Sequence, residues 1–135
     1  MGCGSLIVLD THALIFDALA PARLSARARK AIALADTAGE LACSDISLWE
    51  TAMLIAHKRL DPAMDARQFL HDMIAARHVR VLPITAEIAV LSQSDTFSHG
   101  DPADRLIAAT ARIHRAPLIT SDAQLRQLKD VATIW

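Results

Sequence analysis

The chain has 135 residues, of which 53% are hydrophobic and 21% are charged, and its formal net charge at pH 7 is −1. This length suits one domain with a sizeable core and excludes a second catalytic domain. No apolar run approaches the roughly 18 residues that a transmembrane helix needs, so we expect no membrane association. The near-zero charge does not indicate a globally basic nucleic-acid-binding protein, and any contact with nucleic acid must come from a local patch.

The cysteines and the N-terminus indicate a cytoplasmic protein. Cys3 and Cys43 are far apart, and there is no C-x-x-C pair or zinc-type spacing, so we expect two free thiols in a reducing compartment. The N-terminus lacks the basic segment and the long apolar run of a signal peptide. Residues 1–4 are expected to form a loose leader to a domain that spans the chain 1–135. The apolar surplus suggests surface that a second copy of the chain covers in a homodimer.

The first predicted element is a strand over residues 6–9, and the rest of the chain is interpreted around it. This unbroken apolar run is too short and too β-branched for a helix, and such runs form strands buried on both faces of parallel sheets. The run stops at Asp10, and a helical pattern begins at Thr11. Asp10 therefore stands at the carboxyl end of a strand, where it either caps the helix or belongs to a ligand site.

Helices and strands then alternate along the chain. Ser25 and Gly39 have the residue types of a helix N-cap and C-cap, and Asp101 followed by Pro102 marks another helix start. Either Asp45 or Ser47 is expected to start the helix over 48–58. The alternation predicts a single α/β domain, in which helices flank a central parallel sheet of about four or five strands. Beyond the first strand and helix, the predicted helices cover residues 26–36, 48–58, 65–77, 85–94, 102–114 and 123–128, and the predicted strands cover residues 40–44, 79–82, 118–120 and 131–134.

Two acidic residues follow strands in the same way. Asp122 comes directly after the predicted strand 118–120 and a single serine, much as Asp10 ends the first strand. In a parallel sheet built from right-handed crossovers, the carboxyl ends of the strands meet at one edge. We therefore expect Asp10 and Asp122 on the same side of the domain.

Further acidic residues lie near helix starts. Glu50 shares its helix face with apolar residues, where a carboxylate is costly unless it is paired, so it either joins a site or extends to water. Asp101 and Asp104 flank the start of the helix that begins at Pro102. Asp101 suits the cap, because a residue before proline is driven out of the helical region. Asp104, one turn in, is the better candidate for a site.

A cluster of carboxylates requires a cation. At about 4 Å and an effective dielectric near 20, each pair of like charges costs on the order of 4 kcal/mol. Oxygen donors without Cys or clustered His indicate Mg²⁺ or Mn²⁺ and not zinc. Such ions activate water and neutralise charge that develops on a phosphoryl group, which is the chemistry of phosphodiester hydrolysis. The candidate ligands are Asp10, Glu50, Asp104 and Asp122.

Four motifs together resemble the PIN-domain ribonucleases, and specifically the VapC-type toxins of bacterial toxin–antitoxin modules. They are Leu-Asp-Thr-His-Ala-Leu at 9–14, Ser-Leu-Trp-Glu at 47–50, Asp-Pro-Ala-Asp-Arg-Leu-Ile-Ala-Ala-Thr-Ala at 101–111 and Ile-Thr-Ser-Asp at 119–122. No single motif is specific, but the ordered set covers nearly the whole chain. One departure is Gly100, where relatives often have a basic residue.

The resemblance implies a PIN-like fold and a Mg²⁺- or Mn²⁺-dependent endoribonuclease. It implies that the acidic site consists of the same four carboxylates, with Thr11 and Thr120 as polar supports and Asp101 close by. It also implies RNA as substrate and a cognate antitoxin protein as partner. Arg105, Arg112, Lys58 and Arg59 are candidates for phosphate contacts, although each also suits an ordinary solvated helix face.

Two other classes of protein remain open at this point. A phosphotransferase of the haloacid-dehalogenase type would need Asp-x-Asp after the first strand, and His12 occupies the second place. A response-regulator receiver would need a lysine near the last strand, which is not evident. The other class is a catalytically silent binding module on a PIN-like scaffold, and the presence of all four acids argues against it. His12 and His99 are expected to be surface residues, and Trp49 is expected in the core or in an interface.

Overall fold

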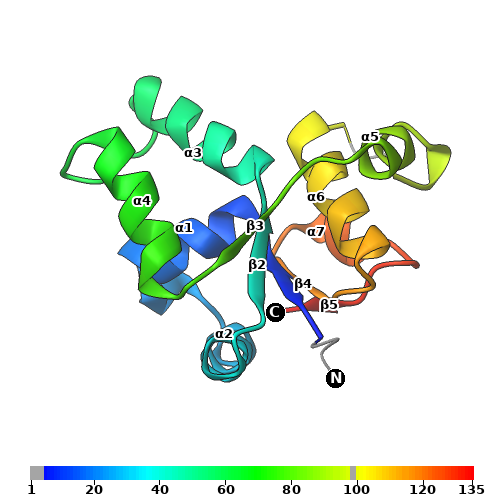
Figure 1. The fold of residues 1–135 in the computed structure, drawn as a ribbon, viewed down its shortest axis with the longest axis horizontal. Coiled ribbons are helices and arrows are strands. Elements are labelled where there is room, and N and C mark those ends of the chain that lie inside the picture. The colour runs from blue at the N-terminus through cyan, green and yellow to red at the C-terminus, as the bar shows by residue number, and fades with distance from the viewer. Residues whose placement is uncertain (1–4, 98–99) are drawn as a thin grey trace.

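A five-stranded parallel sheet with the strand order β3-β2-β1-β4-β5 forms the centre of the fold (Figure 1). The computed structural model describes residues 5–97 and 100–135, so the predicted leader, Cys3 and His99 lie outside the described residues. The prediction of a single α/β domain with a parallel sheet is confirmed. The strands are β1 Ile7–Leu9, β2 Leu41–Ser44, β3 Arg80–Leu82, β4 Leu118–Ile119 and β5 Thr133–Ile134.

Helices cover both faces of the sheet (Figure 1). One apolar core packs α1, α2 and α4 against one face, and a second core packs α5, α6 and α7 against the other. In the described ranges, no helix is long and apolar enough to cross a bilayer. The helices are α1 Thr11–Leu19, α2 Ala26–Ala38, α3 Ile46–Ala56, α4 Ala66–Ala76, α5 Ala86–Ser92, α6 Pro102–Ile113 and α7 Ala123–Arg126, with short 3-10 turns at Pro21–Arg23 and Asp95–Phe97.

The capping residues account for most helix boundaries. Ser25 accepts a hydrogen bond from the Ala28 N–H at 3.0 Å, and Gly39 ends α2 in the left-handed conformation with φ of 70°. Helix α3 begins at Ile46, two residues before the predicted range, and its N-cap is Asp45, one of the two expected start residues. Its preceding residue, Asp45, makes no side-chain cap bond to α3 and instead accepts a hydrogen bond from the Ile84 N–H at 3.3 Å.

Two sequence predictions concern single side chains. Cys43 is a free, buried cysteine, as expected, and burial raises the pKa of its thiol to about 12, so the thiol stays protonated. Trp49 is 57% exposed, so the core placement that was one of its two expected positions is wrong. Its helix neighbour Glu50 takes the inward-facing position instead.

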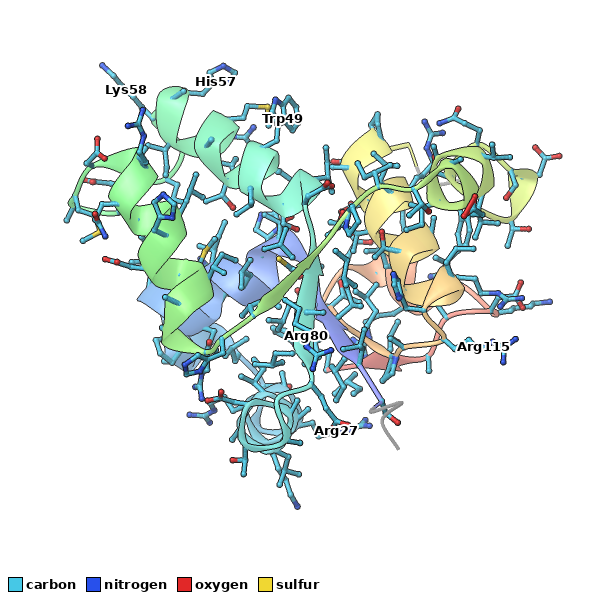
Figure 2. All side chains as sticks on the ribbon, viewed as in Figure 1. Arg27, Trp49, His57, Lys58, Arg80 and Arg115 are labelled. Atoms are coloured by element: carbon cyan, nitrogen blue, oxygen red, sulfur yellow. The ribbon has the colours of Figure 1, made fainter. Side chains whose placement is uncertain are left out.

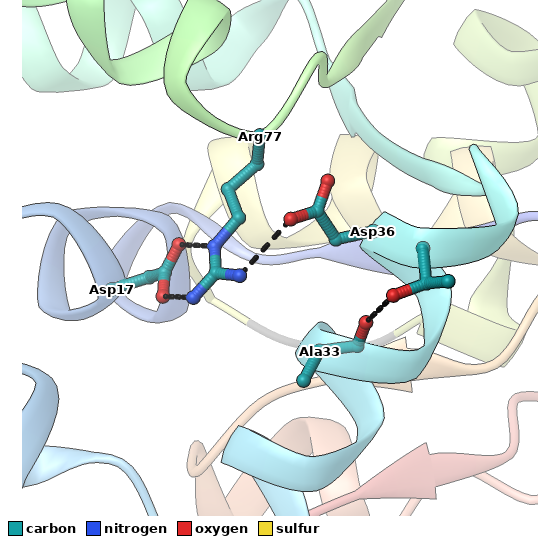
Figure 3. Close-up of polar contacts among 5 residues, drawn as sticks. Asp17, Ala33, Asp36 and Arg77 are labelled. Atoms are coloured by element: carbon teal, nitrogen blue, oxygen red, sulfur yellow. Dashed lines mark hydrogen bonds and ion pairs between the residues drawn. The ribbon is translucent and has the colours of Figure 1, made fainter.

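Arg77 connects three helices on one side of the sheet (Figure 3). Its guanidinium donates two hydrogen bonds of 3.1 Å to the carboxylate of Asp17 on α1 and one of 3.1 Å to Asp36 on α2. The side chain of Asp17 is only 11% exposed, so its charge needs this partner. The fork geometry of arginine fixes the end of α4 relative to α1, the helix that directly follows Asp10.

Candidate functional site

Asp10 and Asp122 lie at the same edge of the sheet, where neighbouring parallel strands β1 and β4 end. The Asp10 N–H donates to the Ile119 carbonyl at 3.1 Å, which ties the end of β1 to β4. Each aspartate caps the helix that follows it. Asp10 accepts from the Ala13 N–H at 2.8 Å, and Asp122 accepts from the Leu125 N–H at 2.9 Å. A carboxylate has two oxygens with several acceptor sites, so a cap bond does not prevent a second role.

Glu50, in the second turn of α3, and Asp104, in the first turn of α6, approach the same edge. Helix α3 carries Glu50 and packs against α6, which carries Asp104. Glu50 is only 9% exposed, and its Oε1 atom is buried without a hydrogen-bond partner among the described residues. A buried carboxylate oxygen that accepts nothing is costly, so the site is incomplete without a donor or a cation at Glu50.

These four carboxylates line one cavity of about 290 Å³. The segments that supply them are separated by tens of residues in the chain, and the sheet topology brings them together. The same cavity is lined by His12, Asp101 and Ser121. We infer that the cavity is an anionic site built at the carboxyl edge of the sheet, the edge at which α/β proteins bind ligands.

The carboxylates disturb one another's ionisation. Burial and the charges of Asp101, Asp122, Glu50 and Asp10, in that order of importance, together raise the pKa of Asp104 to about 7. Burial also raises the pKa of Asp10 above its usual range, against the hydrogen bonds from Thr120 and Ala13 that lower it. Raised carboxyl pKa values in one cavity are the pattern expected where a positive charge is missing.

Asp101 was expected to cap α6, and the structure also places it at the cavity. Its Oδ1 accepts from the Ala103 N–H at 2.8 Å and from the Asp104 N–H at 3.2 Å, so it is the cap of α6, as predicted. It also lines the cavity, and its charge acts on Asp104. Asp104 lies one turn further in, as expected, and faces the same cavity.

The two threonines differ in what they contact. The Thr120 hydroxyl donates to the Asp10 carboxylate and accepts from the Asp122 N–H at 3.0 Å, so it supports both strand-end acids. Thr11 is buried and its hydroxyl lies 2.9 Å from that of Ser47, so it joins α1 to α3 and does not line the cavity. Thr11 therefore acts on the site only through the packing of the helix that carries Glu50.

The residues that line the cavity fit a hard divalent cation in their chemistry. Every donor among the four acids is a carboxylate oxygen, and Glu50 Oε1 is the buried atom that a cation would satisfy. Within residues 5–97 and 100–135, however, no three His, Cys, Asp or Glu side chains already stand at metal-ligating distances. Binding would therefore draw the side chains inward, against the mutual repulsion that raises the pKa of Asp104.

Sequence reasoning missed two residues of the cavity. His12 is exposed, as expected of a surface residue, but its place in the cavity lining, in the first turn of α1, was not predicted. Ser121, between Thr120 and Asp122, was not considered, although its place beside a strand-end acid was a usable signal. Of the basic residues proposed for phosphate contacts, none lines this cavity among the described residues.

The whole chain is similar to known proteins in sequence and in fold. The PIN domain family model matches residues 7–131. The chain is 38% identical over 132 residues to Ribonuclease VapC22 of Mycobacterium tuberculosis, and the alignment covers 96% of this chain and 98% of that protein.

Solved structures share the fold. The VapBC2 structure from Rickettsia felis, bound to a DNA fragment from the promoter, contains a chain that matches with a TM-score of 0.72 at 13% identity, over 95% of this chain and 96% of that one. A toxin–antitoxin complex from Klebsiella pneumoniae matches with a TM-score of 0.60 at 24% identity, over 94% and 96%. The same arrangement of strands and helices therefore persists where most of the sequence differs.

Proposed function

The chain belongs to the PIN domain family, and on this basis we propose that it is an endoribonuclease that hydrolyses RNA phosphodiester bonds with Mg²⁺ or Mn²⁺ in its acidic cavity. The observation that carries the proposal is the meeting of four carboxylates from four separate segments in one cavity. The 38% identity to a named ribonuclease over almost the whole length of both chains supports the reaction class.

Each residue has a part in this proposal. Asp10, Glu50, Asp104 and Asp122 would hold the cation, which when bound supplies charge neutralisation at the phosphoryl group and a more acidic water. Thr120 orients the Asp10 carboxylate through its hydroxyl. Asp101 fixes the first turn of α6 and thereby the position of Asp104.

The experiment that tests this function is cleavage of single-stranded RNA by the purified protein, with Mg²⁺, with Mn²⁺ and with EDTA. We expect cleavage with either metal and none with EDTA, because the cavity alone offers only repulsion to a phosphate. Cleavage that EDTA leaves unchanged would contradict the metal role. RNA that is bound and never cut would favour the silent binding module.

We further propose that the protein is the toxin of a type II toxin–antitoxin system and acts in the cytoplasm, with an antitoxin protein as partner. The motifs that resemble VapC toxins and the identity to VapC22 support this role. The fold shared with a chain of a toxin–antitoxin complex is consistent with it.

We also propose that the protein forms a homodimer. Large apolar side chains that a monomer would leave in water support this: Trp49 on α3 is 57% exposed and Val90 on α5 is 75% exposed. Light scattering at micromolar concentration should give about twice the mass of the chain. A single-chain mass at high micromolar concentration would contradict the dimer.

A further inference from the structure

A second cavity of about 270 Å³ lies beside the acidic one, between α1 and the end of α3. His12 lines both cavities, so the two are neighbours across this side chain. We call the second cavity the arginine groove, and its lining is His12, Ile15, Phe16, Leu19, Ala20, Arg23, Leu54, Arg59 and Leu60. A linear polymer that occupies the acidic cavity can therefore continue directly into the arginine groove.

The two cavities carry opposite charge. The acidic cavity is lined by five carboxylates when Asp101 is included. The arginine groove is lined by Arg23 and Arg59, and no Asp or Glu of the described residues lines it. A ligand that is anionic along its length would be attracted by the two arginines in the groove and, in the acidic cavity, only through the proposed cation.

Flat groups stand in a row along the groove. The Arg23 guanidinium carbon lies 4.2 Å from the centroid of the Phe16 ring, and the Phe16 ring centroid lies 6.0 Å from that of His12. The row therefore runs from the rim of the acidic cavity outward. Aromatic rings and guanidinium planes are the groups on which unpaired bases stack.

The backbone fixes both arginines. The Arg23 N–H donates to the Ala20 carbonyl at 2.9 Å in the turn after α1, and the Arg59 N–H donates to the Leu54 carbonyl at 2.9 Å after α3. Lys58 takes a left-handed conformation, with φ of 59°, to make that second turn. Both arginine side chains are exposed, so they can meet a ligand without unfolding a helix end.

We propose that the arginine groove binds the single-stranded RNA that flanks the scissile phosphate, with Arg23 and Arg59 on phosphates and the rings of Phe16 and His12 against bases. This inference rests on the proposed ribonuclease function, because it assumes that the cut phosphate sits in the acidic cavity. An acidic protein segment is the competing occupant. The groove's direct continuation of the acidic cavity favours RNA, since the metal there would bind a phosphate of the same strand.

The test compares two double variants in binding and in cleavage. Arg23→Gln with Arg59→Gln removes the groove charges, and Arg80→Gln with Arg115→Gln is the matched control. Arg80 begins β3 and Arg115 precedes β4, so both control residues lie at the opposite, amino edge of the sheet (Figure 2). Binding is measured by the anisotropy of a labelled single-stranded oligoribonucleotide in an Asp10→Asn background, over a range of KCl concentrations.

We expect the groove variant to bind RNA at least about tenfold more weakly at low salt. Its slope of log Kd against log salt should fall by about 1.4, since each phosphate contact in a single strand contributes roughly 0.7. In the chain that retains Asp10, KM for RNA should rise and kcat should change little, because the groove binds the strand away from the cut bond. The control variant should keep the parent's slope and KM.

Three results would overturn the proposal. The first is a groove variant that binds RNA as tightly as the parent does, even if that variant no longer binds a protein partner. The second is an equal loss of RNA binding in the control variant, which would indicate that binding depends only on the total charge of the protein. The third is a parent that binds no RNA. Groove-dependent binding by a protein that never cuts RNA would refute the proposed function and leave the groove as an RNA site.

Discussion

Asp10→Asn is expected to abolish metal-dependent RNA cleavage and to leave the fold intact. The substitution removes one of the four carboxylates proposed to hold the cation, and the loss of rate should exceed the roughly 10–100-fold seen when only a supporting residue of a metal site is lost. The cap of α1 should persist, because asparagine keeps the oxygen that accepts from the Ala13 N–H. Without metal, stability should hold or rise, since burial penalises the charged form of Asp10.

The measurement for Asp10 pairs initial cleavage rates in Mg²⁺ with melting temperatures in EDTA. Asp72→Asn is a matched control, because Asp72 is an exposed aspartate of α4 that does not line the acidic cavity. The control should cut RNA at the parent's rate. If Asp10→Asn also cuts RNA at that rate, Asp10 is no metal ligand.

Asp104→Asn should remove cleavage and, in the absence of metal, stabilise the protein at pH 8. The Asp104 carboxyl has a folded-state pKa of about 7 against an ordinary 3.8, so the folded state holds its proton more tightly than the unfolded chain. The contribution of Asp104 to the free energy of unfolding is therefore fully present below pH 3.8 and is lost as the pH rises through 7. Allowing for solvent screening of this partly exposed group, the loss is about 1–2 kcal/mol, or about 3–8 °C in melting temperature.

The pH dependence separates this electrostatic effect from ordinary stabilisation. In EDTA, the melting temperature of Asp104→Asn should exceed that of the parent at pH 8, and the difference should shrink steadily as the pH falls towards 5. Added Mg²⁺ should stabilise the parent and not the variant, because ligands that bind only the folded state raise its stability. A difference that is constant with pH would mean that Asp104 ionises normally.

Asp101→Asn is the informative comparison for Asp104. Asparagine keeps the oxygen that caps α6, so the melting temperature should stay near the parent's and activity should fall only modestly. An inactive Asp101→Asn beside an active Asp104→Asn would show that the third metal acid is Asp101.

Local signals in the sequence were sufficient to predict most of the fold. Helix α2 matched its prediction to within two residues because Ser25 and Gly39 act through bonds to their own helix. Helix α3 was placed two residues late, because Asp45 bonds across the fold to Ile84, and no local pattern reports a contact between residues 39 positions apart.

The site was predictable where it depends on strand ends. The shared edge of Asp10 and Asp122 followed from parallel topology alone, and the structure places both in one cavity. The sequence posed cap and ligand site as alternatives for Asp10, yet the structure shows that Asp10 caps its helix and also lines the cavity, and Asp101 does the same at α6. The arginine groove was not predictable, since it exists only where the end of α3 packs beside α1.

The central claim is that the acidic cavity holds a divalent cation, and its most direct test is anomalous diffraction from crystals soaked in Mn²⁺. The account predicts a peak in the cavity with carboxylate oxygens of Asp10 and of at least one of Glu50, Asp104 and Asp122 at roughly 2 Å from the ion. It also predicts that the peak is lost in Asp10→Asn crystals soaked in the same way. A soaked parent crystal with no peak in this cavity, or with a peak only elsewhere on the chain, would contradict the account.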